Sequence, residues 1–107
     1  MNNNDDIDLG SDLHITKVEK RTSAPGAWVT GTLHGHKFQA LVFPEHAECS
    51  EYEIGDSKIS KLWIRCESQK KTVYNWDRGA DIPPANTLVT KIVGFLCAGL
   101  ADHIFSE

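Results

Sequence analysis

The segment GAWVTGTLHGHKFQALVF, residues 26–43, constrains the fold more than any other part of the chain. Two runs rich in β-branched and aromatic residues flank His34-Gly35, and glycine there allows the positive φ that a two-residue hairpin turn requires. Pairing Leu33 with His36 gives the hairpin two different faces. One face is apolar, with Val29, Leu33, Phe38, Ala40 and Val42, and the other carries Trp28, Thr30, Thr32, Lys37, Gln39 and Leu41.

A second hairpin is predicted from residues 58–66 and 71–76, with its turn at Ser68-Gln69. Strict alternation sets Trp63 opposite Tyr74. One face then holds Leu62, Ile64 and Val73, and the other holds Lys61, Trp63, Arg65, Thr72, Tyr74 and Trp76. A further strand is expected over residues 13–20, while residues 77–86 are interpreted as a connector because they contain Gly79 and Pro83-Pro84.

The end of the chain is predicted to be helical from about Ala85. Its apolar residues recur at helical spacing: Leu88, Val89, Ile92, Phe95, Leu96, Leu100 and Ile104. One helix covers only one face of a single sheet, and the apolar face is the one to cover. The expected fold class is therefore α+β, an antiparallel β-meander of four to five strands with one long C-terminal helix packed on one face.

The acidic residues concentrate at the start of the chain. Residues 1–12 contain Asp5, Asp6, Asp8 and Asp12 but neither lysine nor arginine, and the rest of the chain carries equal numbers of acidic and basic side chains. We expect residues 1–12 to be a disordered acidic tail and residues 13–107 to be a single domain. With 3 cysteines and no leader-like N-terminus, the expected setting is cytoplasmic, without a membrane.

The face left uncovered by the helix is the candidate binding surface. It would combine aromatic and basic side chains: Trp28, Lys61, Trp63, Arg65, Tyr74 and Trp76. We interpret it as the contact surface of a non-enzymatic protein-interaction module without a cofactor. Two other interpretations stay open. These pairs could simply stabilise an exposed sheet, or the rings could stack on single-stranded nucleic acid, which the neutral charge of the domain disfavours.

A rival hypothesis is a zinc site or a hydrolytic enzyme that uses His34, His36, His46 and Cys49. Imidazole and thiolate are zinc ligands, and a thiol beside a histidine can be a nucleophile. However, His34 and His36 flank a turn, so their side chains start on opposite faces. The chain also lacks a paired Cys-x-x-Cys motif, so no metal is expected.

The helix offers a second candidate contact. Between Ile92 and Ala101 its only polar side chain is the thiol of Cys97, and its outer side is predicted to carry Gly94, Ala98 and Ala101. A surface helix is normally polar on that side. A homodimer through these small residues would cover it, and the loop of residues 44–57 or the N-terminal strand is the competing cover.

Several short motifs match a known pattern. They are Trp28, Gly31, Gly35, Phe38, Ala40 and Phe43 in the first hairpin, Ile59 to Leu62, and Asp77, Arg78, Gly79 and Asp81 before the helix. Over residues 27–105 the chain resembles a family of small uncharacterised bacterial and phage-encoded proteins, from which it departs at Ala80, where the family often has an aromatic residue. The resemblance implies this architecture and no activity.

Overall fold

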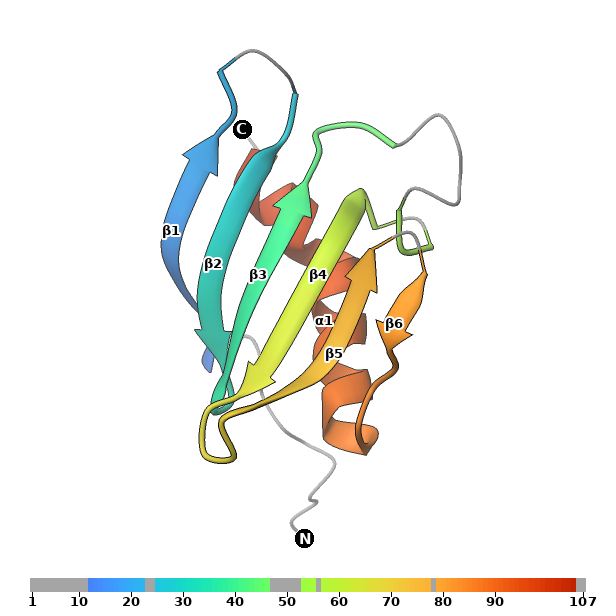
Figure 1. Ribbon diagram of the computed structural model, residues 1–107. Helices are drawn as coiled ribbons and strands as arrows, with labels where there is room; N and C mark the ends of the chain where they lie inside the picture. Colours follow the sequence, from blue (N-terminus) through green and yellow to red (C-terminus); the bar gives the residue numbers. More distant parts are fainter. Residues whose placement is uncertain (1–11, 23–24, 47–52, 56, 78, 106–107) are drawn as a thin grey trace, which may run out of the picture.

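The computed structural model describes residues 12–22, 25–46, 53–55, 57–77 and 79–105 (Figure 1). These residues form a six-stranded sheet and one helix: β1 (His14–Lys20), β2 (Ala27–Leu33), β3 (His36–Val42), β4 (Ile59–Cys66), β5 (Lys71–Asp77), β6 (Ala80–Ile82) and α1 (Thr87–Phe105). Each strand pairs antiparallel with the next along the chain. The α+β meander is confirmed, with one strand more than the upper end of the expected number. The predicted acidic tail falls almost entirely outside the described residues.

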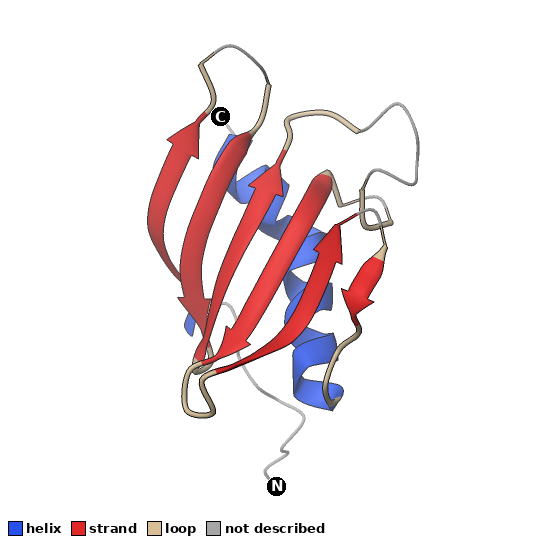
Figure 2. Cartoon of the chain, in the orientation of Figure 1, coloured by secondary structure: helices blue, strands red, loops and turns tan. Residues whose placement is uncertain are grey.

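The molecule has two layers, one sheet and one helix (Figure 2). Helix α1 crosses behind the sheet from β6 toward β1 (Figure 1). The core between the layers consists of fully buried aliphatic and aromatic side chains from strands β2, β3 and β4 and from the helix, among them Val29, Leu33, Phe38, Ile59, Leu62, Ile64, Val89, Ile92 and Leu96. The helix thus covers the apolar face of the sheet, as the alternation predicts.

The first hairpin has the predicted register throughout, from Ala27 opposite Val42 to Leu33 opposite His36. His34 and Gly35 form its turn with φ of 50° and 75°. Positive φ at both central residues is the geometry of a type I′ turn, which matches the twist of the flanking strands. The turn chemistry and the alternation therefore determine this hairpin completely.

The second hairpin corrects the expected register. Arg65 pairs with Thr72 as predicted, but a β-bulge follows, and Trp63 faces Asn75 instead of Tyr74. In the predicted register Asn75 would lie opposite Leu62 in the core, where an unpaired amide is costly. Val73 keeps its predicted place on the core face, whereas the bulge turns Tyr74 and Trp76 toward the core as well and places Asn75 outside. Val73 and Tyr74 are only 3% and 4% exposed.

The expected connector before the helix contains a strand. Asp77 N–H donates to the carbonyl of Gly79 (2.9 Å), and this tight turn, with φ of 140° at Gly79, returns the chain as β6 beside β5. The helix then starts at Thr87, two residues later than predicted. Asn86 caps it, since its Oδ1 accepts from the N–H of Val89 (3.0 Å).

Helix α1 has 19 residues and a mean hydropathy of 1.6, so by length and composition alone it could cross a membrane. The core helix of a globular domain meets the same criteria. Here Val89, Ile92, Leu96 and Leu100 are buried against the sheet. These contacts pack one side of the helix on the sheet.

Candidate functional site

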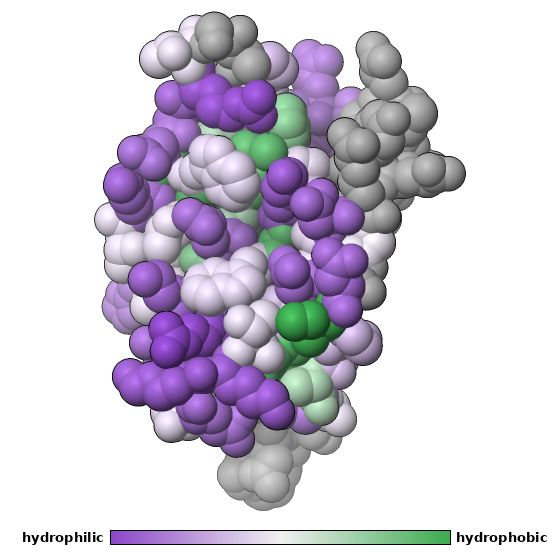
Figure 3. Space-filling view, viewed as in Figure 1, coloured by the Kyte–Doolittle hydropathy of each residue, from purple (hydrophilic) through white to green (hydrophobic). Residues whose placement is uncertain are grey.

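The sheet face opposite the helix, called the open face below, is built from cross-strand rows. Residues that face each other across antiparallel strands share a face, so the observed pairing lines up side chains across the sheet. One row contains Glu19, Trp28, Leu41, Lys61 and Asp77, and the next contains Lys17, Thr30, Gln39, Trp63 and Asn75. This face is mixed in character, with pale and green areas among hydrophilic ones (Figure 3).

A depression of about 180 Å³ lies on this face, lined by Trp28, Gln39, Lys61, Leu62, Trp63, Asn75, Trp76 and Asp77. Trp28 and Trp63 come from strands β2 and β4, and Gln39 comes from β3 between them. Its lining therefore includes indole rings, side-chain amides and one ion pair. Such a mixture can hold an apolar group and hydrogen-bond its neighbours.

The indole of Trp63 is held in place. Its Nε1–H donates to Oγ1 of Thr72 on β5, at 3.0 Å. The side chain is half-buried, so the ring is anchored at its polar edge while part of it stays accessible. A ring already fixed in one orientation loses little entropy when a partner packs against it.

Three basic side chains of the open face, Lys17, Lys61 and Arg65, have acidic neighbours. Lys61 Nζ lies 3.5 Å from Asp77 Oδ2, and Lys17 Nζ lies 3.4 Å from Glu19 Oε2. Arg65 Nε is 4.0 Å from an oxygen of Glu67 in the β4–β5 turn. These side chains are about a third to two-thirds exposed, so each pair contributes little to stability. The face is thus not a uniformly positive surface.

Two of the predicted surface residues, Tyr74 and Trp76, are placed differently. Tyr74 is 4% exposed and belongs to the core, where burial raises the pKa of its phenol to about 12. Trp76 packs against the core and also lines the depression. The bulge at Val73 is the physical reason for both placements, because it reverses the side to which the following residues point. Trp28, Lys61, Trp63 and Arg65 remain on the open face.

The histidines of the rival hypothesis do not form one site. His34 and His36 lie at the hairpin end of β3, and His46 follows the other end of this seven-residue strand, about 20 Å away at strand rise. Nδ1 of His36 is 2.8 Å from the carbonyl oxygen of His34, and His36 is 7% exposed on the core side. Cys49 lies outside the described residues. No group of three or more potential metal ligands is found among the residues that the structure describes.

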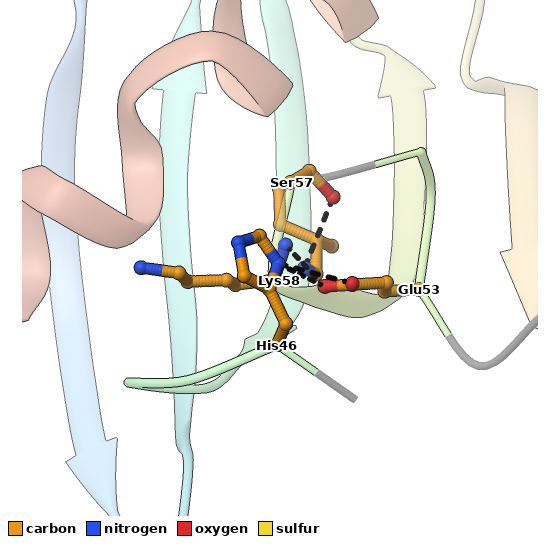
Figure 4. Close-up of polar contacts among 5 residues, drawn as sticks. His46, Glu53, Ser57 and Lys58 are labelled. Carbon is orange, nitrogen blue, oxygen red and sulfur yellow. Dashed lines mark hydrogen bonds and ion pairs between the residues drawn. The ribbon is translucent and has the colours of Figure 1, made fainter. Parts of the chain in front are cut away.

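Glu53 is a structural residue that the sequence interpretation missed, since it seemed one of several solvated carboxylates. It is 5% exposed, and its Oε1 accepts from the N–H of Lys58 at 2.8 Å (Figure 4). Its Oε2 lies 3.1 Å from Nδ1 of His46. The carboxylate therefore ties the chain before β4 to the segment after β3. The sequence of residues 45–56 contains no signal that distinguishes Glu53 from the other acidic residues of this segment.

Two cysteines have opposite environments. Burial raises the pKa of the Cys97 thiol on α1, and a hydrogen bond with the hydroxyl of the buried Ser57 acts against this shift. At the β4–β5 turn, the hydroxyl of Ser68 (3.4 Å) lowers the pKa of the Cys66 thiol, helped by the backbone of Gln69. Cys66 is thus the more nucleophilic thiol of the two.

The outer side of the helix agrees only partly with the proposed small-residue contact. Gly94 and Ala98 are exposed, whereas Ala101 is 7% exposed and packs in the core. Ala101 is therefore removed from that candidate set. Of the candidate set, Gly94 and Ala98 remain on the solvent side of α1.

The fold and the open face define a class, a two-layer α+β domain in which, among the described residues, the helix covers one side of a single sheet. Within this class the chain belongs to the family described as a domain of unknown function (DUF7678), whose sequence model matches residues 27–101. The match extends from the first residue of β2 into α1 and leaves out β1. No curated protein and no solved structure matches the chain.

Proposed function

We propose that the chain is a non-enzymatic protein-interaction module that binds a protein partner through the open face. The observation that supports this most directly is the depression lined by Trp28 and Trp63. Tryptophan is among the residues that contribute most to protein–protein binding, particularly where it is rigid and surrounded by groups that exclude water. The hydrogen bond from Trp63 to Thr72 supplies that rigidity.

A protein partner accounts for the charges better than a nucleic acid does. Binding to phosphates requires cations that are free to release counterions. On the open face Lys61 and Lys17 each already have a carboxylate within 4.0 Å. Paired charges of both signs at the rim of an aromatic patch are typical of protein interfaces.

The residues that line the depression indicate which groups a partner would place there. An apolar or aromatic side chain would pack against the indoles of the lining, while the amides of Gln39 and Asn75 can hydrogen-bond a peptide backbone beside it. The Lys61–Asp77 pair at the edge of the depression would set the orientation of a partner. These groups together define one contact centre.

Affinity capture from the native host tests the proposal. The tagged full chain is compared with Trp63→Ala and with the matched control Asp102→Asn, an exposed residue on the helix. We expect a defined protein to be retained by the wild type and the control and lost with Trp63→Ala. Equal retention by all chains, or capture of nucleic acid that disappears with Trp63→Ala, would contradict the proposal.

A further inference from the structure

Strand β1 is the long free edge of the sheet. It lies at one end of the strand order, and most of its seven residues are exposed. The opposite edge, β6, has three residues and runs into Pro83-Pro84, which have no N–H to donate to a further strand. In the part of the chain that the structure describes, β1 is therefore the only edge strand long enough to pair with another strand.

The hydrogen bond from Arg21 to Gly26 shows which groups of β1 point outward. Arg21 N–H donates to the Gly26 carbonyl at 3.1 Å, in register with the β1–β2 pairs. Bonded and non-bonded pairs alternate along an antiparallel ladder, so the amides of Lys17 and Glu19 point toward β2. The N–H and C=O groups of Val18 and Lys20 consequently point away from the sheet.

The side chains of β1 are complementary to themselves. Lys17 and Glu19 lie on the open face, at positions opposite Thr30 and Trp28. Val18 lies on the other face, beside the buried Val29, and is 41% exposed. Within the described residues, Val18 and Ile82 are the exposed large hydrophobic side chains, and each lies on an edge strand.

We infer that two copies of the chain pair antiparallel through β1, about a two-fold axis at Val18. In this register each Val18 exchanges backbone hydrogen bonds with its counterpart and packs against it. Lys17 of each copy faces the partner's Glu19 on the open face. The pairing joins both sheets into one and places the two open faces side by side.

The charges that permit this register disfavour others. Lysines and a bulge are common protections of an edge strand, and β1 has both, with its bulge between Ile15 and Lys17. A shift of two residues would move a lysine away from its acid and bring like charges together. The same residues that deter foreign strands thus select a second copy of this chain.

Charge exchange tests the register. Sedimentation equilibrium of the full chain at micromolar concentration is expected to show a dimer. Lys17→Glu and Glu19→Lys each place like charges opposite one another and should weaken it about tenfold. The double variant K17E/E19K should restore the affinity, and an equimolar mixture of the two single variants should form a heterodimer, because opposite charges then meet again.

Two further variants separate this interface from the helix. Val18→Pro removes an outward N–H that makes no bond to β2, so it should abolish the dimer while the circular dichroism spectrum is retained. Ala98→Glu on the outer side of α1 should leave the dimer intact. A monomer throughout, a dimer lost with Ala98→Glu, or no recovery in the double variant and the mixture would overturn the inference.

Discussion

Replacing Gly31 by alanine tests how closely three parts of the sheet approach one another. A Cβ at Gly31 would lie 2.6 Å from the carbonyl oxygen of His14 on β1 and 2.9 Å from the ring of Phe38. The ring can move slightly, but the backbone oxygen can move only if β1 shifts. Overpacking of this kind costs roughly 1–3 kcal/mol. The reduced entropy of the unfolded chain offsets roughly 0.4–1 kcal/mol of that cost.

The expected result is a loss of about 1–2 kcal/mol in the free energy of unfolding. For a domain of this size it corresponds to a decrease of roughly 4–16 °C in Tm. Urea unfolding followed by circular dichroism and by tryptophan fluorescence gives the value. An unchanged m-value, the slope of the free energy of unfolding against urea concentration, would show that the variant still unfolds as one unit.

The same substitution at Gly94 is the matched control. A Cβ there meets nothing within 4 Å, and the residue is exposed within α1. Alanine in a helix interior is favoured over glycine by roughly 0.5–1 kcal/mol, so Gly94→Ala should stabilise the protein. If Gly31→Ala were neutral, or if both substitutions changed stability in the same direction, the close approach of the β1 backbone to Gly31 on β2 would be wrong.

Two predictions concern ionisable groups. Because burial raises the pKa of Tyr74 from 10.0 to about 12, the neutral phenol stabilises the fold below pH 10, and this contribution is lost as the pH rises through 12. Ultraviolet titration of the tyrosines should show a late ionisation step that is missing in Tyr74→Phe. A single step at the ordinary tyrosine pKa in the wild type would contradict this prediction. In a Cys49→Ser background, iodoacetamide at neutral pH should modify Cys66 before Cys97, and Ser68→Ala should slow the reaction of Cys66. Peptide mass spectrometry measures the labelling of each cysteine. Faster labelling of Cys97 than of Cys66 would refute the environments described for the two thiols.

The first hairpin and the helix could be predicted because local rules and burial agree there. Alternation, the His34-Gly35 turn and helical spacing all describe the same arrangement, and the structure has it. The expectation of an uncharacterised family over residues 27–105 agrees with the family match over residues 27–101, while the bacterial or phage origin of that family stays a prediction. Where local signals support each other, one sequence is sufficient for the topology.

The second hairpin could not be predicted fully because a bulge overrides alternation. Strict alternation predicts Tyr74 on the surface and Asn75 in the core, where an unpaired amide is costly. Burial of the Tyr74 ring together with exposure of the Asn75 amide favours the bulge. The polarity of Asn75 is the sequence signal for this bulge, and strict alternation, which ignores it, places the buried Tyr74 on the surface.

Strand β6 and the buried Glu53 depend on contacts that the sequence does not express locally. Three residues before Pro83 are too few to show alternation, and they pair because the turn at Gly79 returns them to β5. Glu53 is buried because its carboxylate accepts the N–H of Lys58, a residue whose backbone has a positive φ of 65°. Tertiary geometry determines both.

Site-specific photocrosslinking in the host cell tests the role of the open face most directly. A benzophenone amino acid at Gln39, an exposed residue that lines the depression, is compared with the same group at Asp102 on the helix. A protein adduct should form from position 39, disappear when Trp63→Ala is added, and be missing from position 102. Adducts to nucleic acid, or protein adducts from position 102 alone, would contradict an interaction module that acts through this face.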